Sequence, residues 1–175
     1  MNLVSGRNPK LTSSINPQLT SRLNPNLTSR LNPKLTSRIN PKLTSRLNPN
    51  LTSRLNPKLT SKINPRLTSR LNPNLTSRLN PNLTSRLNPQ LTSNIEGLFI
   101  FNLQNNPVAF TVTESDDFWL IFDLKNRFIG FSVRVDDNFL NVFDTNNDWV
   151  GYFVQADENV HLRFDLKNNW VGSTA

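Results

Sequence analysis

An eight-residue repeat constrains this chain more than any other feature. From Asn8 onward the pattern NPxLTSRL recurs, with Asn at every eighth position as far as Asn88, which makes eleven units. Leucine holds the fourth place of each unit, and leucine or isoleucine holds the eighth. A strict short period of this kind is typical of structures in which like units pack against one another in series.

Three backbone conformations compete for this array. A continuous helix conflicts with a proline in every unit, and an eight-residue period drifts by about 80° per unit on a helix of about 3.6 residues per turn. Separate one-turn helices fit Asn-Pro as N-cap and first helical residue, but Thr, Ser and Asn dominate the rest of the unit. We favour LTSRL as a short strand and NPx as a corner, because the residue before proline prefers extended geometry and proline fixes the bend.

A longer, 24-residue period lies within the array. It links three series: Lys10, Lys34 and Lys58; Asn26, Asn50 and Asn74; and Ile15, Ile39 and Ile63. If one such period forms a coil with three sides, equivalent side chains stack in columns. We therefore predict an all-β chain whose array is a β-solenoid or fibre shaft with a 24-residue super-repeat. A two-sided, 16-residue coil, a gene duplication without structural meaning and a disordered basic tail are the alternatives.

The seventh place of nine successive units carries a cation, and we call these nine residues the basic ladder: Arg22, Arg30, Arg38, Arg46, Arg54, Lys62, Arg70, Arg78 and Arg86. The first and last units carry Ser14 and Asn94 there, as terminal capping units do. The ladder predicts a binding strip for an anionic polysaccharide or another polyanion. Nucleic acid fits less well, since the array has no aromatic side chain on which bases could stack. A solvated face that keeps the protein soluble is the structural alternative.

Charge divides the chain in two. Residues 1–97 carry +14 and residues 98–175 carry −6, within a total of +8. We expect an N-terminal extension over 1–7, the array over 8–95 and an acidic antiparallel β domain over 98–175. Opposite charges on the two segments would also allow head-to-tail pairing between copies.

A second, 21-residue repeat fills the acidic segment. Its four copies read FNLQNNPVAF from Phe101, FDLKNRFIGF from Phe122, FDTNNDWVGY from Phe143 and FDLKNNWVGS from Phe164. Each copy combines two alternating apolar runs with an Asn-rich turn, as in a β-hairpin. The segment therefore predicts about eight short antiparallel strands in a meander, closed as a small barrel or curled sheet to hide its edges.

Aromatic residues follow the Asn-rich turns at equivalent positions. Phe128, Trp149 and Trp170 would pack in the core or form a sugar-stacking shelf, with Asn147 and Asn168 as hydrogen-bonding partners. Three aspartates would add further hydrogen bonds: Asp123, Asp144 and Asp165. In outline these hairpins resemble the cell-wall-binding repeats of bacterial surface proteins, although they lack the adjacent aromatic pair and the glycine-rich first turn of that family.

Catalytic and targeting signals are sparse. The chain has no cysteine, a single histidine and no nucleotide, phosphate-loop or metalloprotease motif, so we expect no enzyme activity, cofactor or metal. We expect no transmembrane segment and see no Sec signal, which leaves the localisation open: extracellular or cell-surface if the protein is exported or processed, and otherwise cytoplasmic. In a glycosylating compartment four sequons would be acceptors: Asn26, Asn50, Asn74 and Asn82.

Two functions fit these observations. The first is a self-assembling fibre or filament subunit with a β head that docks or binds, a plan that resembles viral and phage fibres and bacterial adhesins. The second is a soluble binding module in which the basic ladder holds an anionic polymer and the head is lectin-like.

Overall fold

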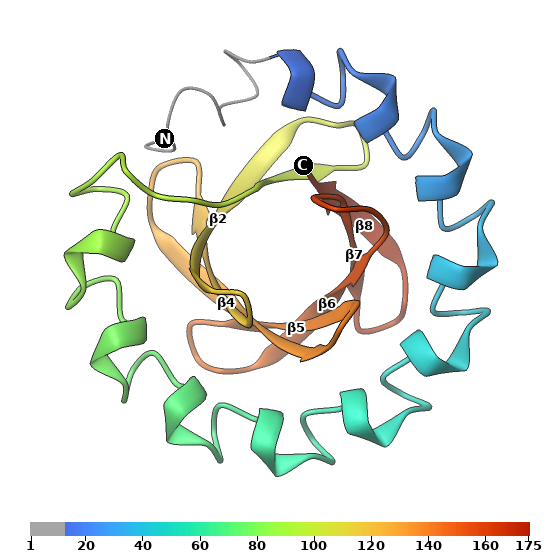
Figure 1. Ribbon diagram of the computed structural model, residues 1–175. Helices are drawn as coiled ribbons and strands as arrows, with labels where there is room; N and C mark the ends of the chain where they lie inside the picture. Colours follow the sequence, from blue (N-terminus) through green and yellow to red (C-terminus); the bar gives the residue numbers. More distant parts are fainter. Residues whose placement is uncertain (1–12) are drawn as a thin grey trace.

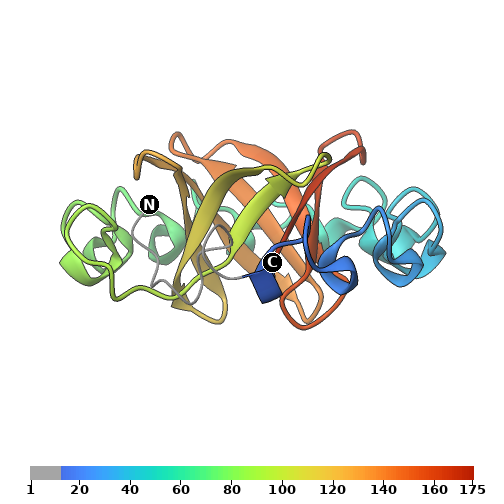
Figure 2. The ribbon, with the colours of Figure 1, turned by 90° about the horizontal axis from the view of Figure 1, so that it is seen from above.

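The computed structural model describes residues 13–175 and consists of two concentric layers. The array forms a ring, and the C-terminal segment forms a β-barrel inside that ring (Figure 1). In the view turned by 90°, the turns of the ring lie on both sides of the barrel (Figure 2). The predicted extension over 1–7 and the start of the first unit, with Lys10, lie outside the described residues. Among residues 13–175, no helix has the length and apolar character to cross a membrane.

The barrel is a closed antiparallel meander of eight strands in which each strand pairs with the next along the chain. β1 also pairs with β8, placing Phe101 opposite Ser173 and closing the sheet. This confirms the predicted all-β class and the eight-stranded closed meander. The strands are β1 (Phe99–Asn102), β2 (Pro107–Ser115), β3 (Phe118–Asp123), β4 (Phe128–Asp136), β5 (Phe139–Asp144), β6 (Trp149–Gln155), β7 (His161–Asp165) and β8 (Trp170–Thr174).

The four Asn-rich turns share one construction. The fourth residue of each turn is an asparagine in the left-handed region, with φ between 61° and 64°, which asparagine tolerates better than most residues. In the β5–β6 turn, Asp144 Oδ1 accepts hydrogen bonds from the backbone N–H groups of Asn146 and Asp148, each 2.9 Å. The left-handed asparagine recurs in every hairpin, and the turn's first place holds aspartate in three hairpins and Asn102 in the first, because the turn requires a side-chain oxygen there.

The array consists of short 3-10 turns. They are η2 (Ser13–Ile15), η3 (Ser21–Leu23), η4 (Ser29–Leu31), η5 (Ser37–Ile39), η6 (Ser45–Leu47), η7 (Ser53–Leu55), η8 (Ser61–Ile63), η9 (Ser69–Leu71), η10 (Ser77–Leu79) and η11 (Ser85–Leu87). A second turn over NPxL alternates with them. In the unit from Asn48, Leu51 N–H and Thr52 N–H both donate to Asn48 O, and Leu55 N–H donates to Thr52 O. Thr60 Oγ1 then joins the next unit by donating to Ser53 O at 2.7 Å.

The preferred strand assignment for the array is therefore wrong, and the structure does not confirm a β-solenoid or fibre shaft. Within LTSRL the threonine is extended but the following SRL forms a 3-10 turn, and the asparagine before each proline is extended as expected. A strand needs a neighbouring strand for its backbone donors and acceptors, whereas the single-layered ring offers none. Local turns satisfy those groups instead.

The main hydrophobic core lies between the two layers. The eighth-place leucines and isoleucines of the array point inward and are buried, as Leu31, Leu55 and Leu79 illustrate. They pack against the outward-facing phenylalanines of the barrel, such as Phe110 and Phe139. A smaller apolar cluster fills the barrel interior: Ile100, Ala109, Trp119, Ile121, Leu140, Val142 and Phe153.

The fourth-place leucines take the opposite orientation. Those from Leu19 to Leu91 are 69–71% exposed. In a strand over LTSRL the fourth and eighth places would share one face, and this consequence of the strand assignment is also wrong. An eight-residue unit of two turns directs the two places to opposite sides, so only one leucine per unit reaches the barrel.

The 24-residue period matches the array to the barrel. Asn26, Asn50 and Asn74 donate through Nδ2 to carbonyls of the β1–β2, β7–β8 and β5–β6 turns respectively. A step of three units along the ring therefore corresponds to a step of one hairpin around the barrel. The ring passes the hairpins in the reverse of their order along the chain (Figure 1). The three-sided coil is therefore wrong: the 24-residue period reflects docking of the ring onto successive hairpins of the barrel.

Candidate functional site

The basic ladder lies at the end of the barrel that carries the β2–β3, β4–β5 and β6–β7 turns. These turns are rich in aspartate and glutamate, and we call them the acidic turns. Arg30 pairs with Asp157 at 2.6 Å, Arg54 pairs with Asp136, and Arg78 pairs with Glu114 at 2.9 Å. Arg86 lies 3.7 Å from Glu114. In the Arg30–Asp157 and Arg54–Asp136 pairs both side chains are at least 40% exposed, so each contributes only about 0–1 kcal/mol. The acidic segment that could have paired with another copy thus binds the array of its own chain.

These ion pairs affect the titration of the barrel carboxyls. The hydrogen bond from Arg54 holds the pKa of Asp136 below its ordinary value, and the hydrogen bond from Arg30 does the same for the pKa of Asp157. The other members of the ladder form no ion pair within residues 13–175: Arg22, Arg38, Arg46, Lys62 and Arg70. The ladder is therefore partly a docking device and partly an exposed basic face.

The third place of the units lies at the opposite end of the barrel, beside the Asn-rich turns. Gln18 Nε2 donates to Asn106 Oδ1 at 3.0 Å, and Lys42 Nζ donates to Asn169 Oδ1 at 3.1 Å. Arg66 pairs with Asp148. Because ring and barrel meet along this end, side chains from both layers line the spaces between them.

Two equivalent crevices open at this end, and we name each after its tryptophan. The Trp170 crevice has a volume of about 220 Å³ and is lined by Lys34, Asn40 and Lys42 of the ring together with Asn168, Asn169 and Trp170 of the barrel. The Trp149 crevice, of about 160 Å³, is lined by Lys58, Asn64 and Arg66 together with Asn147, Asp148 and Trp149. The ring residues of the two crevices are 24 positions apart, and the barrel residues are 21 apart.

The predicted aromatic and amide residues thus meet basic side chains of the array. Trp149 and Trp170 are half-buried at the crevices, whereas Phe128 packs beside Phe122 with ring centroids 5.7 Å apart. Trp170 Nε1 donates to Gly172 O at 2.8 Å. Trp149 Nε1 is buried and has no hydrogen-bond partner within residues 13–175.

Asn147 and Asn168 are both buried, and each provides the left-handed residue of its turn. Asn168 Oδ1 accepts a hydrogen bond from Tyr152 Oη at 2.6 Å. Asn147 Oδ1 has no partner in the described part of the chain, because Phe131 stands where the next repeat has Tyr152. The aspartates expected to bind a sugar hold backbone N–H groups of the turns instead, as Asp123 and Asp165 do.

Three of the four sequons contribute to docking of the ring. The side-chain amides of Asn26, Asn50 and Asn74 donate to barrel carbonyls at 2.9, 3.3 and 3.4 Å. A glycan on Nδ2 would replace one hydrogen of that amide and compete for space at the turn. Asn82 has no such side-chain contact among residues 13–175, and its backbone N–H donates to Asn80 Oδ1.

The basic residues of the crevices were not predicted as binding residues. Whereas the predicted binding residues occupy the seventh place of their units, these residues occupy the third: Lys34, Lys42, Lys58 and Arg66. The 24-residue lysine series was the available signal, but it was interpreted only as evidence for a three-sided coil. Within residues 13–175 no group of three or more acidic or histidine side chains is arranged to hold a metal ion.

Comparisons of the chain with protein-family models, with curated proteins and with solved structures gave no match. The geometry of the crevices is therefore the basis for a functional proposal.

Proposed function

We propose that the protein is a non-enzymatic binding protein for acidic glycans, which it holds in the Trp170 and Trp149 crevices. The lining of the Trp170 crevice carries the proposal. It combines an indole ring, three amide side chains and two lysines, and no carboxylate of residues 13–175 lines it. An anion entering this space meets positive charge without a competing internal ion pair.

The residue types suit a sugar acid. An indole face offers a flat apolar surface, and asparagine amides both donate and accept hydrogen bonds, as hydroxyl groups require. The ammonium groups of Lys34 and Lys42 would pair with a carboxylate or sulfate. In the Trp149 crevice Arg66 is paired with Asp148, which leaves Lys58 as the available cation.

Repetition favours a polymer over a single sugar. The two crevices repeat with the hairpins, so neighbouring units of one acidic chain could occupy both. Two linked weak sites then give an avidity above that of either site. This proposal keeps the predicted lectin-like role of the barrel and moves the basic contribution of the array from the seventh place to the third.

The ion pairs between the two layers favour binding over self-assembly. The filament hypothesis rested on opposite charges of the two segments, and in this structure those charges meet within one chain. Sedimentation of the full chain at low and high salt separates the two functions. Filaments that dissolve in salt would favour assembly, whereas a monomer under both conditions favours binding.

Calorimetric titration with oligogalacturonate tests the proposal, with maltooligosaccharide of equal length as the neutral control. We expect the acidic oligomer to bind at least about tenfold more tightly, and its affinity to fall as salt screens the lysines. Equal affinity for both oligomers, or no heat with either, would reject acidic-glycan binding.

Matched variants sharpen the test. Asparagine occupies the third place in several units, so Lys34→Asn with Lys42→Asn suits the ring and removes two charges from the crevice. Serine occupies the seventh place of the first unit, so Arg38→Ser with Arg70→Ser removes two charges from the opposite end. We expect the first pair to weaken binding at least about tenfold and the second pair to change it less than about twofold. Similar losses in both would point to nonspecific charge attraction and contradict the crevice.

A further inference from the structure

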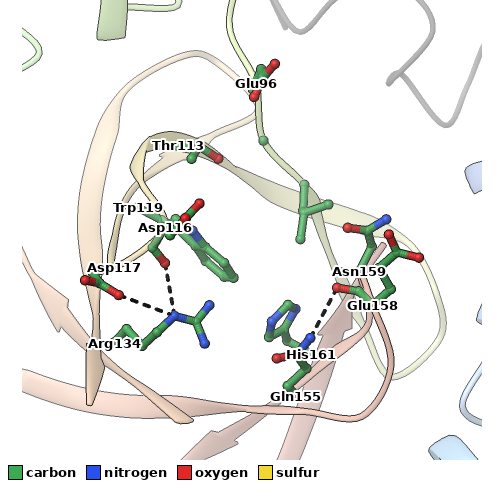
Figure 3. Close-up of a pocket in the computed structure, with 12 residues that line it drawn as sticks. Glu96, Thr113, Asp116, Asp117, Trp119, Arg134, Gln155, Glu158, Asn159 and His161 are labelled. Carbon is green, nitrogen blue, oxygen red and sulfur yellow. Dashed lines mark hydrogen bonds and ion pairs between the residues drawn. The ribbon is translucent and has the colours of Figure 1, made fainter. Parts of the chain in front are cut away.

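A further cavity lies apart from the crevices, in the mouth of the barrel at the end with the acidic turns. Its volume is about 390 Å³. Figure 3 shows Trp119, His161 and Arg134 arranged around it, with carboxylates from the turns and from the segment before β1 at its rim. The volume falls within the range of small-molecule sites.

The wall of the cavity departs from the barrel's own repeat. Positions 98, 119, 140 and 161 are equivalent, and they hold Leu98, Trp119, Leu140 and His161. Two copies thus keep the aliphatic residue expected of a barrel interior, while two carry aromatic heterocycles. The two rings meet edge to face, with centroids 5.0 Å apart and an interplanar angle of 90°.

His161 presents an unsatisfied acceptor to this cavity. The residue is only 3% exposed, and its Nε2 has no hydrogen-bond partner within residues 13–175. Thr174 Oγ1 donates its hydrogen to Asn159 O at 2.8 Å, so the 3.2 Å contact with His161 requires Nδ1 to be the donor. Nε2 therefore carries a lone pair. Burial, with a smaller contribution from the charge of Arg134, lowers the pKa of His161 to about 4, which keeps the ring neutral at pH 7.

The rim is acidic, and its carboxylates differ from those that hold the ring. Asp136, Asp157 and Glu114 pair with arginines of the array. The cavity is lined instead by four other carboxylates, Glu96, Asp116, Asp117 and Glu158. Only Asp117 has an ion pair within residues 13–175, with Arg134 at 3.8 Å.

Arg134 is fixed within the wall and offsets only one of the four carboxylates. Its Nε donates to Asp116 O at 3.0 Å, and its Nη1 donates to Asp137 O at 2.8 Å. Among the described residues, four carboxylates against one guanidinium leave a charge of −3 around the cavity. The site thus combines an indole, an acceptor without a donor and excess negative charge.

We propose that the barrel mouth binds a small organic cation with a primary ammonium group. The carboxylates would attract the charge, the indole of Trp119 would contact the ammonium and its apolar substituent, and an N–H of the ligand would donate to His161 Nε2. This site shares no residue with the two crevices, so amine binding here does not depend on glycan binding there.

Fluorescence titration with phenethylamine tests the site. In the background Trp149→Phe with Trp170→Phe, Trp119 is the single tryptophan and reports on its own cavity; phenylalanine already occupies the equivalent position 128. We expect saturable quenching in phosphate buffer, with phenethyl alcohol and phenethyltrimethylammonium each binding at least about tenfold more weakly. The alcohol lacks the charge and the quaternary ion lacks the N–H donors. Absence of saturable binding, or equal affinity for either analogue, would overturn the proposal.

Substitutions taken from the barrel's own repeat provide the matched variants. Trp119→Leu places leucine where Leu98 and Leu140 stand, so the fold should tolerate it, and calorimetry should show at least about tenfold weaker binding of phenethylamine. Glu158→Gln removes a rim charge, while Asp157→Asn removes a charge from the neighbouring residue that faces Arg30. We expect the first to weaken binding about threefold or more and the second to leave it unchanged. Unchanged affinity in Trp119→Leu would place the amine elsewhere and refute the site.

Discussion

The array and the barrel are both repetitive, yet they satisfy their backbones in opposite ways. Backbone hydrogen bonds of the array join residues three or four positions apart, as in the unit from Asn48, whereas those of the barrel join neighbouring strands. The backbone hydrogen bonds of the array therefore do not connect it to the barrel. Its path around the barrel is set by side chains, through the buried eighth-place residues and the contacts of the third and seventh places.

The barrel depends on the array in turn. Small closed barrels usually bury their large residues inside, but most phenylalanines here face outward, including Phe110, Phe131 and Phe164. The ring covers them and supplies the second layer that a hydrophobic face requires. The segments predicted as separate domains, 8–95 and 98–175, therefore share one core, and neither repeat explains the fold without the other.

The largest effect is expected from separating the two layers. A chain restricted to residues 97–175 would expose the outer phenylalanines, each worth about 1.5–3 kcal/mol of lost burial. We expect it to aggregate or to lack fixed packing, as judged by size-exclusion chromatography with light scattering and by near-ultraviolet circular dichroism. A monomeric fragment with native near-ultraviolet signal would show that the barrel folds without the ring.

A smaller effect should distinguish the two leucines of a single unit. Leu55 is fully buried against the barrel, so Leu55→Ala should lower the free energy of unfolding by about 2–5 kcal/mol. Leu51 is 71% exposed, and Leu51→Ala should change it by less than about 0.5 kcal/mol. Urea unfolding of both variants measures the difference. An equal loss in Leu51→Ala would mean that the fourth-place leucines are covered in solution.

The smallest predicted effect is a gain within the barrel. Phe131→Tyr would reproduce the Tyr152–Asn168 hydrogen bond one repeat earlier and give Asn147 Oδ1 the donor that it lacks among residues 13–175. We expect the free energy of unfolding to rise by about 0.5–1.5 kcal/mol in thermal or urea denaturation.

A double variant provides the control for that gain. Asn147→Gly keeps the left-handed backbone, with φ near 64°, but removes the acceptor. Phe131→Tyr should therefore give no gain when combined with Asn147→Gly. A persistent gain would show that the hydroxyl acts through another contact.

Much of the barrel could be predicted from the sequence because its signals are local and repeated. The alternation of apolar residues indicated the strands, and four equivalent asparagines, one in each repeat, indicated the turns. For the array, the repeat was evident but the conformation was not. Short segments such as LTSRL suit a strand or a 3-10 turn, and only the presence or absence of a neighbouring strand decides between them.

In the candidate sites too, residues of the barrel's repeats could be predicted from the sequence, whereas contacts between distant segments could not. Trp149, Trp170, Asn147 and Asn168 were predicted as a group, and the structure places them at the crevices. The lysines that line the Trp170 crevice were missed because they lie far away along the chain; Lys42 precedes its partner Asn169 by 127 positions. The barrel-mouth cavity was also missed, although the departure of its aromatic wall from the leucines at equivalent positions was visible in the repeat.

The sequence by itself determined the units of this protein: an eight-residue unit, its 24-residue modulation, four 21-residue hairpins and the charge of each segment. The tertiary structure decided which surfaces those units present to one another. Three octapeptides span one hairpin, so the two periods meet around a common axis, and that match depends on the circumference of a closed barrel. Circumference follows from strand number and stagger, which are properties of the closed sheet rather than of any single repeat.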